Sequence, residues 1–189
     1  MLCIIRNSDF QQPTQQFTKY HYSNKGLSVG LVPLANDEMV FFFQYDNQLI
    51  EKAPTENIAD YCARLAKNFP EEIQELVRKN DHGHAHIWRP RDLQLLPTYS
   101  KGSIVLMGDA AHVSLPFTSA GVSEAIIDAN ILVNCLLENT DYRTAFQRYE
   151  ALRKPQIVQV IALATQLKQQ FLKGIGTDGQ NYRMPLIGG

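Results

Sequence analysis

This chain of 189 residues has few cysteines, almost no net charge and no long apolar run, and each shortage excludes a class of protein. Its three cysteines lie far apart without CxxC spacing, which argues against a disulfide framework and fits a reducing compartment. The cytoplasm is therefore the expected location. A net charge of −1 gives no electrostatic case for binding nucleic acid or an anionic membrane surface.

The longest apolar run, residues 157–164, is far shorter than the roughly 20 residues that span a bilayer. The N-terminus has no cleavable signal pattern, so we expect neither a leader nor a membrane segment. With 44% hydrophobic and 20% charged residues, the composition is that of a globular protein. The length suffices for one domain, or two small ones, with a real core.

The first half of the chain has the pattern of a sheet followed by helices. Residues 27–35 and 39–45 are rich in Val, Phe and Leu, which predicts an antiparallel hairpin that turns near Asn36 and Asp37. Alternation along 39–45 would give one face to the core and leave the other to line an aromatic pocket. A helical stripe from Thr55 to Phe69 and a second short helix after Pro70 follow. Residues 84–88 read as a further strand.

The second half predicts a strand, a loop and two long helices. The strand covers residues 103–107, and one apolar face runs along a helix over 119–137. The second helix extends from Thr140 to about Lys173 and is interrupted by Pro155. The expected fold class is α/β in the mixed α+β sense, with an antiparallel sheet and helices before a strand–loop–helix motif.

The stretch GSIVLMGDAAHVSLPF, residues 102–117, carries the chemistry. Small residues at Gly108, Ala110 and Ala111 leave room for a bulky group, and Asp109 offers an acceptor for a hydroxyl. The free N–H groups of the next helix favour an electron-rich oxygen. A flavin fits this outline, and so does a phosphosugar. Alternatively, Asp109 forms an Asx-type turn at the exit of the strand.

The same stretch resembles the second flavin-contacting motif of the FAD-dependent aromatic hydroxylases, the family of p-hydroxybenzoate and salicylate hydroxylase. The resemblance implies FAD as cofactor, NAD(P)H as reductant, and hydroxylation of a small apolar or aromatic substrate through a flavin hydroperoxide. It assigns no catalytic residue. The cofactor-binding positions that it implies, together with neighbouring matches, are Gly108, Asp109, Ala110, Ala111, His112, Pro116, Gly121, Ala125, Asp128 and Ala129.

The chain also departs from the family pattern. Ser119, Ala120 and Gly121 stand where Gly-Gln-Gly is usual, and no GxGxxG unit precedes residue 27. The expected organisation is therefore a substrate-domain-like part over 1–100, a partial FAD-binding part over 101–175 and a tail over 176–189. The alternative to an enzyme is a truncated, non-catalytic paralogue or subunit that acts as a binding module.

The missing nucleotide-binding unit has a consequence for association. Apolar residues that would pack on it lose part of their cover, and exposed apolar surface usually marks an interface. We therefore expect a homodimer or a partner chain. The residues concerned are Ile104, Leu106, Ile126, Val133 and Leu137.

Three other patterns give weaker hypotheses. The GIGTDG at residues 174–179 follows a helix instead of a strand, which is the wrong context for a nucleotide loop. His82, His84 and His86 alternate as metal ligands can, but no further ligands complete a site, so a polar turn is preferred to a metal. His112 has the chemistry of an acid or base, although packing and hydrogen bonding are its main role in the resembled family.

Overall fold

The computed structural model describes residues 2–6, 9, 16–22, 26–46, 57–80, 82–91 and 93–173. The chain divides into two compact units. Unit 1 contains the described residues up to Trp88 and the end of the last helix from Gln170, and unit 2 contains those from Arg89 to Gln169.

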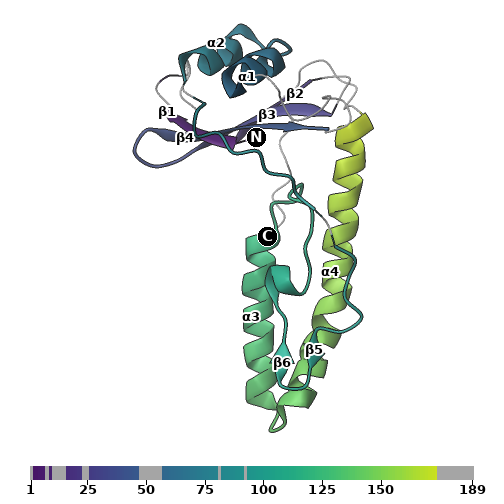
Figure 1. Cartoon of the computed structure of the whole chain (residues 1–189). Coiled ribbons are helices and arrows are strands. Elements are labelled where there is room, and N and C mark those ends of the chain that lie inside the picture. The colour runs from purple at the N-terminus through teal and green to yellow at the C-terminus, as the bar shows by residue number, and fades with distance from the viewer. Residues whose placement is uncertain are drawn as a thin grey trace. The chain divides into compact units, whose positions relative to one another are not determined.

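Unit 1 is built on a four-stranded antiparallel sheet in the order β1-β4-β3-β2 (Figure 1). The central hairpin consists of β3, Leu27–Pro33, and β4, Glu38–Tyr45, and its turn places Asn36 and Asp37 at φ of 59° and 61°. Asn and Asp tolerate this left-handed conformation, which suits a tight hairpin turn. The outer strands are β1, Leu2–Arg6, paired with β4, and β2, Thr18–His21, paired with β3.

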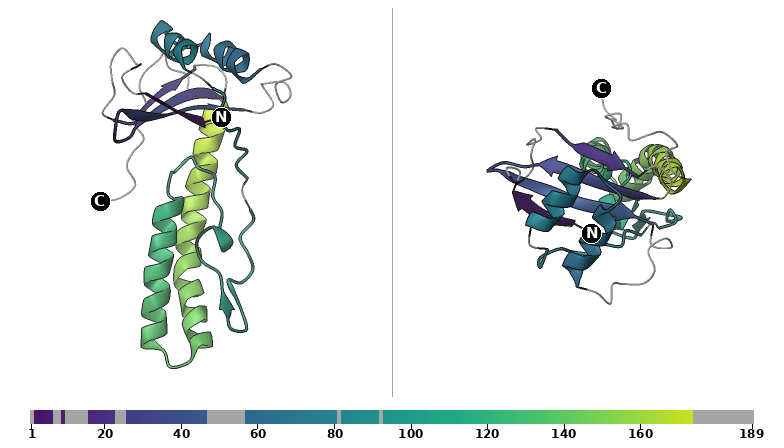
Figure 2. Two further views of the ribbon diagram at one scale, coloured as in Figure 1. Left: turned by 60° about the vertical axis from the view of Figure 1, so that its left-hand side comes forward. Right: turned by 90° about the horizontal axis from the view of Figure 1, so that it is seen from above.

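Two short helices cover one face of this sheet (Figure 2). Helix α1, Ile58–Ala66, begins after Asn57, whose side chain accepts hydrogen bonds from two N–H groups of the first turn. Helix α2, Glu71–Lys79, begins after Pro70. Alternate β4 side chains face the helices, because successive strand residues point to opposite sides. The core includes Leu31, Met39, Phe41, Phe43, Tyr61, Leu65, Ile73 and Leu76, each at most 3% exposed.

Unit 2 consists of two long antiparallel helices with a small hairpin and a turn beside them (Figure 1). The hairpin pairs β5, Ser100–Lys101, with β6, Ile104–Val105, and the 3₁₀ turn η2 covers Gly108–Ala110. The helices are α3, Gly121–Glu138, and α4, Tyr142–Lys173. The buried apolar cluster is small and contains Tyr99, Ala111, Cys135, Ala145 and Tyr149.

The structure confirms the mixed fold class, the central hairpin and the two helices after it, and it corrects three details. Residues 84–88 form no strand, because only His86 makes an isolated bridge. The strand predicted over 103–107 has two residues, Ile104 and Val105. Helix α4 passes through Pro155 without a break, although proline removes one backbone donor.

The apolar face predicted for helix 119–137 is only partly buried, with Leu132 packed against the core of unit 2. Val122 is 77% exposed and Ile126 is 59% exposed, whereas the buried residues of α3 are Asp128 and Cys135. Ile104 and Leu137 are also exposed, as expected for residues that lack a packing partner, while Leu106 packs against the small core. No helix in the described part of the chain is long and apolar enough to cross a membrane.

Candidate functional site

The turn at Gly108 is held in a conformation that only glycine adopts easily. Gly108 has φ of +56°, and a Cβ placed there would lie 3.1 Å from the Cβ of Ala125 on α3. Its carbonyl accepts the N–H groups of Ala111 and His112, each at 2.9 Å. The turn therefore packs closely against α3, and backbone hydrogen bonds within residues 108–112 stabilise it.

Asp109 projects from this turn into the open. Its side chain is exposed and makes no hydrogen bond or ion pair with any residue that the structure describes. An Asx-type turn would need the carboxylate to accept a backbone N–H nearby, and the described residues contain no such bond. Ala110 beside it is exposed as well. The carboxylate is a free acceptor with small neighbours.

The first turn of α3 supplies free donors in the same unit. Ala120 at the N-cap makes no side-chain cap, and Gly121 has open space where a Cβ would point. Within the described residues, no acceptor is present for the N–H groups at the start of the helix, as is usual for an uncapped N-terminus. The loop before it passes through Ser119 at φ of 53°, a strained conformation for a non-glycine residue. Pro116 is half-buried in this loop.

A buried cluster of charged side chains lies behind the turn. The Oδ2 atom of Asp128 accepts the Gly108 N–H at 2.6 Å and the Nε2–H of His112 at 2.7 Å. Its Oδ1 atom accepts from Nε of Arg153 at 2.5 Å. Asp128 and Arg153 are 0% and 1% exposed. His112 is thus a packing and hydrogen-bonding residue in this structure.

Arg153 on α4 connects this carboxylate to the start of α3. Its Nη2 atom lies 2.6 Å from Glu124 Oε2, and its Nη1 atom donates to Gln156. Burial alone would lower the pKa of Arg153, but the bonds to Glu124 and Asp128 outweigh it and the pKa is raised. Burial would likewise raise the pKa of Asp128, but the bonds to Gly108, Arg153 and His112 hold it below its usual value. Both groups are therefore charged at neutral pH.

Two tyrosines border the cluster. Burial, followed by the charge of Asp128, raises the pKa of both Tyr99 and Tyr149 above the ordinary value. The rings lie 6.2 Å apart between centroids, and Tyr99 lies 6.1 Å from the ring of His112. Both hydroxyls stay protonated near neutral pH and have no role as bases there.

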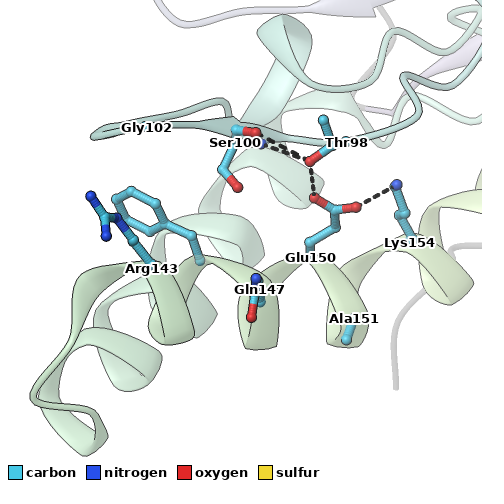
Figure 3. A pocket seen from close by; sticks show the side chains of 9 residues that line it. Thr98, Ser100, Gly102, Arg143, Gln147, Glu150, Ala151 and Lys154 are labelled. Atoms are coloured by element: carbon cyan, nitrogen blue, oxygen red, sulfur yellow. Dashed lines mark hydrogen bonds and ion pairs between the residues drawn. The ribbon is translucent and has the colours of Figure 1, made fainter.

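A cavity of about 430 Å³ lies between the β5–β6 hairpin and the side of α4 that faces it (Figure 3). Glu150 crosses it, accepting the N–H of Tyr99 at 2.7 Å, the Thr98 hydroxyl at 2.8 Å and Lys154 Nζ at 2.5 Å. Arg143 lies at its edge. The Glu150 carboxylate accepts three hydrogen bonds from the protein and so joins the hairpin to α4. Neither Asp109 nor Pro116 lines the cavity.

The other residues predicted as candidates, the histidines of 82–86 and the GIGTDG segment, are not part of this site. His82 is buried, with Nε2 2.8 Å from the carbonyl oxygen of Val77. No group of three potential metal ligands occurs among the residues that could be described. The GIGTDG segment, residues 174–179, lies outside the described residues.

Comparison with known proteins decides the family. A family model described as an FAD binding domain matches residues 2–164, which is most of the chain. The chain belongs to this family. The chain is also similar to the phenazine 1,6-dicarboxylic acid hydroxylase PhzS of Lysobacter antibioticus, 43% identical over 70 residues, covering 37% of this chain and 17% of that protein. It is likewise similar to the kynurenine 3-monooxygenase of Salinispora arenicola, 32% identical over 109 residues, covering 57% and 23%.

Solved structures show the same fold. HpxO of Klebsiella pneumoniae, complexed with FAD and uric acid, superposes with a TM-score of 0.75 at 19% identity, covering 90% of this chain and 43% of that one. A salicylate hydroxylase substrate complex gives a TM-score of 0.68 at 18% identity, covering 94% and 48%. This FAD binding domain protein thus spans less than half the length of those neighbours. The predicted membership of the FAD-dependent hydroxylase and monooxygenase family is confirmed.

The residues at the Gly108 turn fit the flavin cofactor of the family. A free carboxylate at Asp109 suits a sugar-alcohol hydroxyl, and the uncapped helix start suits an electron-rich ring or phosphate oxygen. The small side chain of Ala110 is exposed and does not obstruct an approach to the backbone, whereas Ala111 is buried in the apolar cluster of unit 2. Sequence reasoning located this turn but gave Asp128 no role beyond a motif match and missed Arg153, because their pairing appears only when α3 and α4 are side by side.

Proposed function

We propose that this chain forms part of the flavin site of an FAD-dependent monooxygenase that hydroxylates a small apolar or aromatic substrate. The observation that carries the proposal is the free Asp109 carboxylate, presented by a left-handed glycine turn in a chain of the FAD binding domain family. The solved neighbours named above include complexes with uric acid and with FAD, which supports the class of substrate and cofactor.

Each proposed cofactor residue has a distinct role. Gly108 sets the turn, Asp109 accepts a hydroxyl of the flavin side chain, Ala110 keeps the approach open, and Ala111 packs the turn into the apolar cluster behind it. Pro116 and Gly121 shape the loop and the helix start that face the ring. FAD, when bound, supplies the redox and oxygen-transfer chemistry, with NAD(P)H as the proposed source of electrons. The protein residues bind and orient the cofactor and exclude water.

The exposed side of α3 supports the proposal of a homodimer or a partner chain. Val122, Ile126, Val133 and Leu137 are between 52% and 80% exposed, and Ile104 of the hairpin is 67% exposed. A cluster of large apolar side chains in water is costly and usually marks an interface. The free, buried thiol of Cys135 supports the proposed cytoplasmic location.

The proposal is tested by FAD titration of the purified chain, followed by flavin fluorescence. We expect a dissociation constant in the range of tens of micromolar, about 6 kcal/mol of binding free energy. Asp109→Ala should weaken binding roughly 10- to 150-fold, the value of a charge-assisted hydrogen bond, and leave the melting temperature unchanged.

The matched control is Asp60→Ala, which removes an exposed carboxylate from the first turn of α1 in unit 1. It should leave FAD affinity unchanged. Loss of stability without a change in affinity for Asp109→Ala would contradict the proposed role. A wild-type chain that binds no FAD at concentrations near 1 mM would favour the alternative of a non-catalytic binding module.

A further inference from the structure

The buried carboxylate of Asp128 holds both ends of the turn that carries Asp109. It accepts the N–H of Gly108, one residue before Asp109, at 2.6 Å, and the ring N–H of His112, three residues after it, at 2.7 Å. Two bonds from one oxygen therefore bracket the turn. The backbone conformation that aims Asp109 outward depends on a side chain that does not itself reach the exposed surface.

The same cluster also holds the start of α3. Arg153 binds Asp128 through Nε, and Nη2 reaches the Glu124 carboxylate at 2.6 Å and the Glu124 carbonyl oxygen at 3.4 Å. Glu124 belongs to the first turn of α3, next to the free N–H groups at Gly121. One guanidinium thus connects the two parts of the candidate flavin site, the Gly108 turn and the helix start.

Burial of these charges is poorly explained by stability alone. A buried ion pair often contributes little compared with apolar residues of the same volume, because desolvation offsets the attraction. What such a pair does provide is a fixed arrangement, since each group has only a few partners that satisfy it. Here the buried pair of Asp128 and Arg153 fixes the Gly108 turn, whose exposed residue Asp109 has no partner among the described residues.

We propose that Asp128, held by Arg153, is a positioning residue that keeps the Gly108–His112 turn in the conformation in which Asp109 binds FAD. This inference rests on the proposed function. It predicts that the turn is rigid before the cofactor arrives, so that binding does not have to order it.

The test variant is Asp128→Asn, which keeps the shape but replaces one acceptor oxygen with an NH2 group. The single amide oxygen can face either Arg153 or the Gly108 and His112 donors, so at least one of the three bonds that the carboxylate accepts is lost. The matched control is Glu150→Gln on α4. Glu150 also accepts a backbone N–H, from Tyr99 at 2.7 Å, and also binds a cation, Lys154, but it does not contact the turn.

The first measurement is hydrogen exchange of the Gly108 amide, followed by NMR without FAD. Asp128→Asn should speed this exchange by about tenfold or more relative to other amides of unit 2, and Glu150→Gln should not. Equal exchange at Gly108 in the two variants would overturn the proposal, whatever the affinity for FAD.

The second measurement is the FAD dissociation constant, taken at the same interval below the melting temperature of each variant. Asp128→Asn should raise it about tenfold or more, and Glu150→Gln by less than about threefold. Similar increases in the dissociation constant of both variants would overturn the proposed role of Asp128 in FAD binding. A wild-type chain without FAD binding refutes the proposed function and with it that role, while the exchange of Gly108 still decides whether Asp128 clamps the turn.

A second variant, Arg153→Lys, applies if Asp128→Asn does not fold. Lysine keeps the charge but cannot reach Asp128 and Glu124 with a rigid fork. We expect faster exchange at Gly108 and weaker FAD binding than in the wild type. Both changes should be smaller than those caused by a full loss of the carboxylate. Unchanged exchange in this folded variant would contradict the proposal.

Discussion

Unit 1 and unit 2 are stabilised in different ways. Unit 1 encloses a continuous apolar core between a sheet and two helices, with Val29, Leu31 and Ile73 fully buried. Unit 2 has a buried apolar cluster of five residues, and the largest fully buried side chain among its described residues is a charged one, Arg153. Meanwhile much of the apolar surface of α3 faces outward. Unit 1 is thus stabilised mainly by its own buried apolar side chains, whereas unit 2 depends on a few specific hydrogen bonds and ion pairs.

The largest expected effect comes from breaking the ion pair of unit 2. Arg153→Met should cost about 3–5 kcal/mol, because it leaves the Asp128 carboxylate buried without its cation. The double variant with Asp128→Leu should recover much of this loss, since no unpaired charge remains. Urea denaturation gives the free energies, and hydrogen exchange of α3 peptides locates the change in unit 2. A double variant as unstable as the single one would show that packing, and not charge, limits this unit.

An apolar deletion in unit 1 sharpens the comparison. Leu31→Ala should cost about 3 kcal/mol, because the side chain is 0% exposed and leaves a cavity under α1 and α2. Leu34→Ala is the control, since Leu34 is 43% exposed and should change stability by less than about 0.5 kcal/mol. The same urea experiment measures both, and exchange should rise in peptides of α1 and α2.

A smaller effect of opposite sign is expected at Lys19 in unit 1. Burial lowers its pKa from 10.5 to about 8, with Nζ bonded to Gln44 Oε1 at 2.7 Å. Because the unfolded chain binds the proton more tightly, this group makes stability rise with pH between about 8 and 10.5. Lys19→Met should therefore stabilise unit 1 at pH 7 by about 1–2 kcal/mol and flatten that rise.

The control for Lys19 is Lys67→Met, which changes an exposed lysine at the end of α1. It should leave both the stability and its pH dependence within about 0.5 kcal/mol of the wild type. Thermal melts at pH 7, 8, 9 and 10 separate the two variants. Identical pH profiles for the wild type and Lys19→Met would refute the buried cation.

The smallest effect on stability is expected on the outer face of α3. Leu137→Ser should change the free energy of unfolding by less than about 0.5 kcal/mol, because Leu137 is 80% exposed. It should nevertheless reduce self-association in sedimentation experiments, since it removes apolar surface from the proposed interface. Cys135→Ser on the buried side of the same helix is the contrast, because it should reduce stability instead of association.

Local patterns predicted unit 1 better than unit 2. Alternation in 39–45 and the helical stripes of α1 and α2 specify which side is buried, and the structure agrees. The edge strands β1 and β2 were not predicted, because short strands are defined by partners such as Phe41 and Leu31 far along the chain. The predicted strand at 84–88 was wrong because β-like composition does not supply a partner strand.

In unit 2 the sequence located the turn but not what holds it. Gly108 and Asp109 stand out because an apolar segment precedes them and small residues follow. The contact of Asp128 with His112 and Arg153 joins positions 16 and 25 residues apart, and no local periodicity encodes such distances. Exposure of some apolar residues on α3 was expected from the sequence, but only through the resemblance to the hydroxylase family and not from the periodicity of the helix. The cofactor role of the predicted site residues stays a prediction until FAD is titrated.

The order β1-β4-β3-β2 makes β1 and β2 the outer strands of the described sheet, and the two edges differ in their risk of aggregation. Strand β2 carries Lys19 and His21, polar residues of the kind that discourage another strand from adding. Strand β1 has the sequence LCIIR, and Ile4 on it is 59% exposed. In a concentrated preparation, the β1 edge is therefore where one molecule would extend the sheet of the next. A residue or partner that covers the β1 edge would therefore keep such a solution clear for longer, even without a change in the thermodynamic stability of either unit.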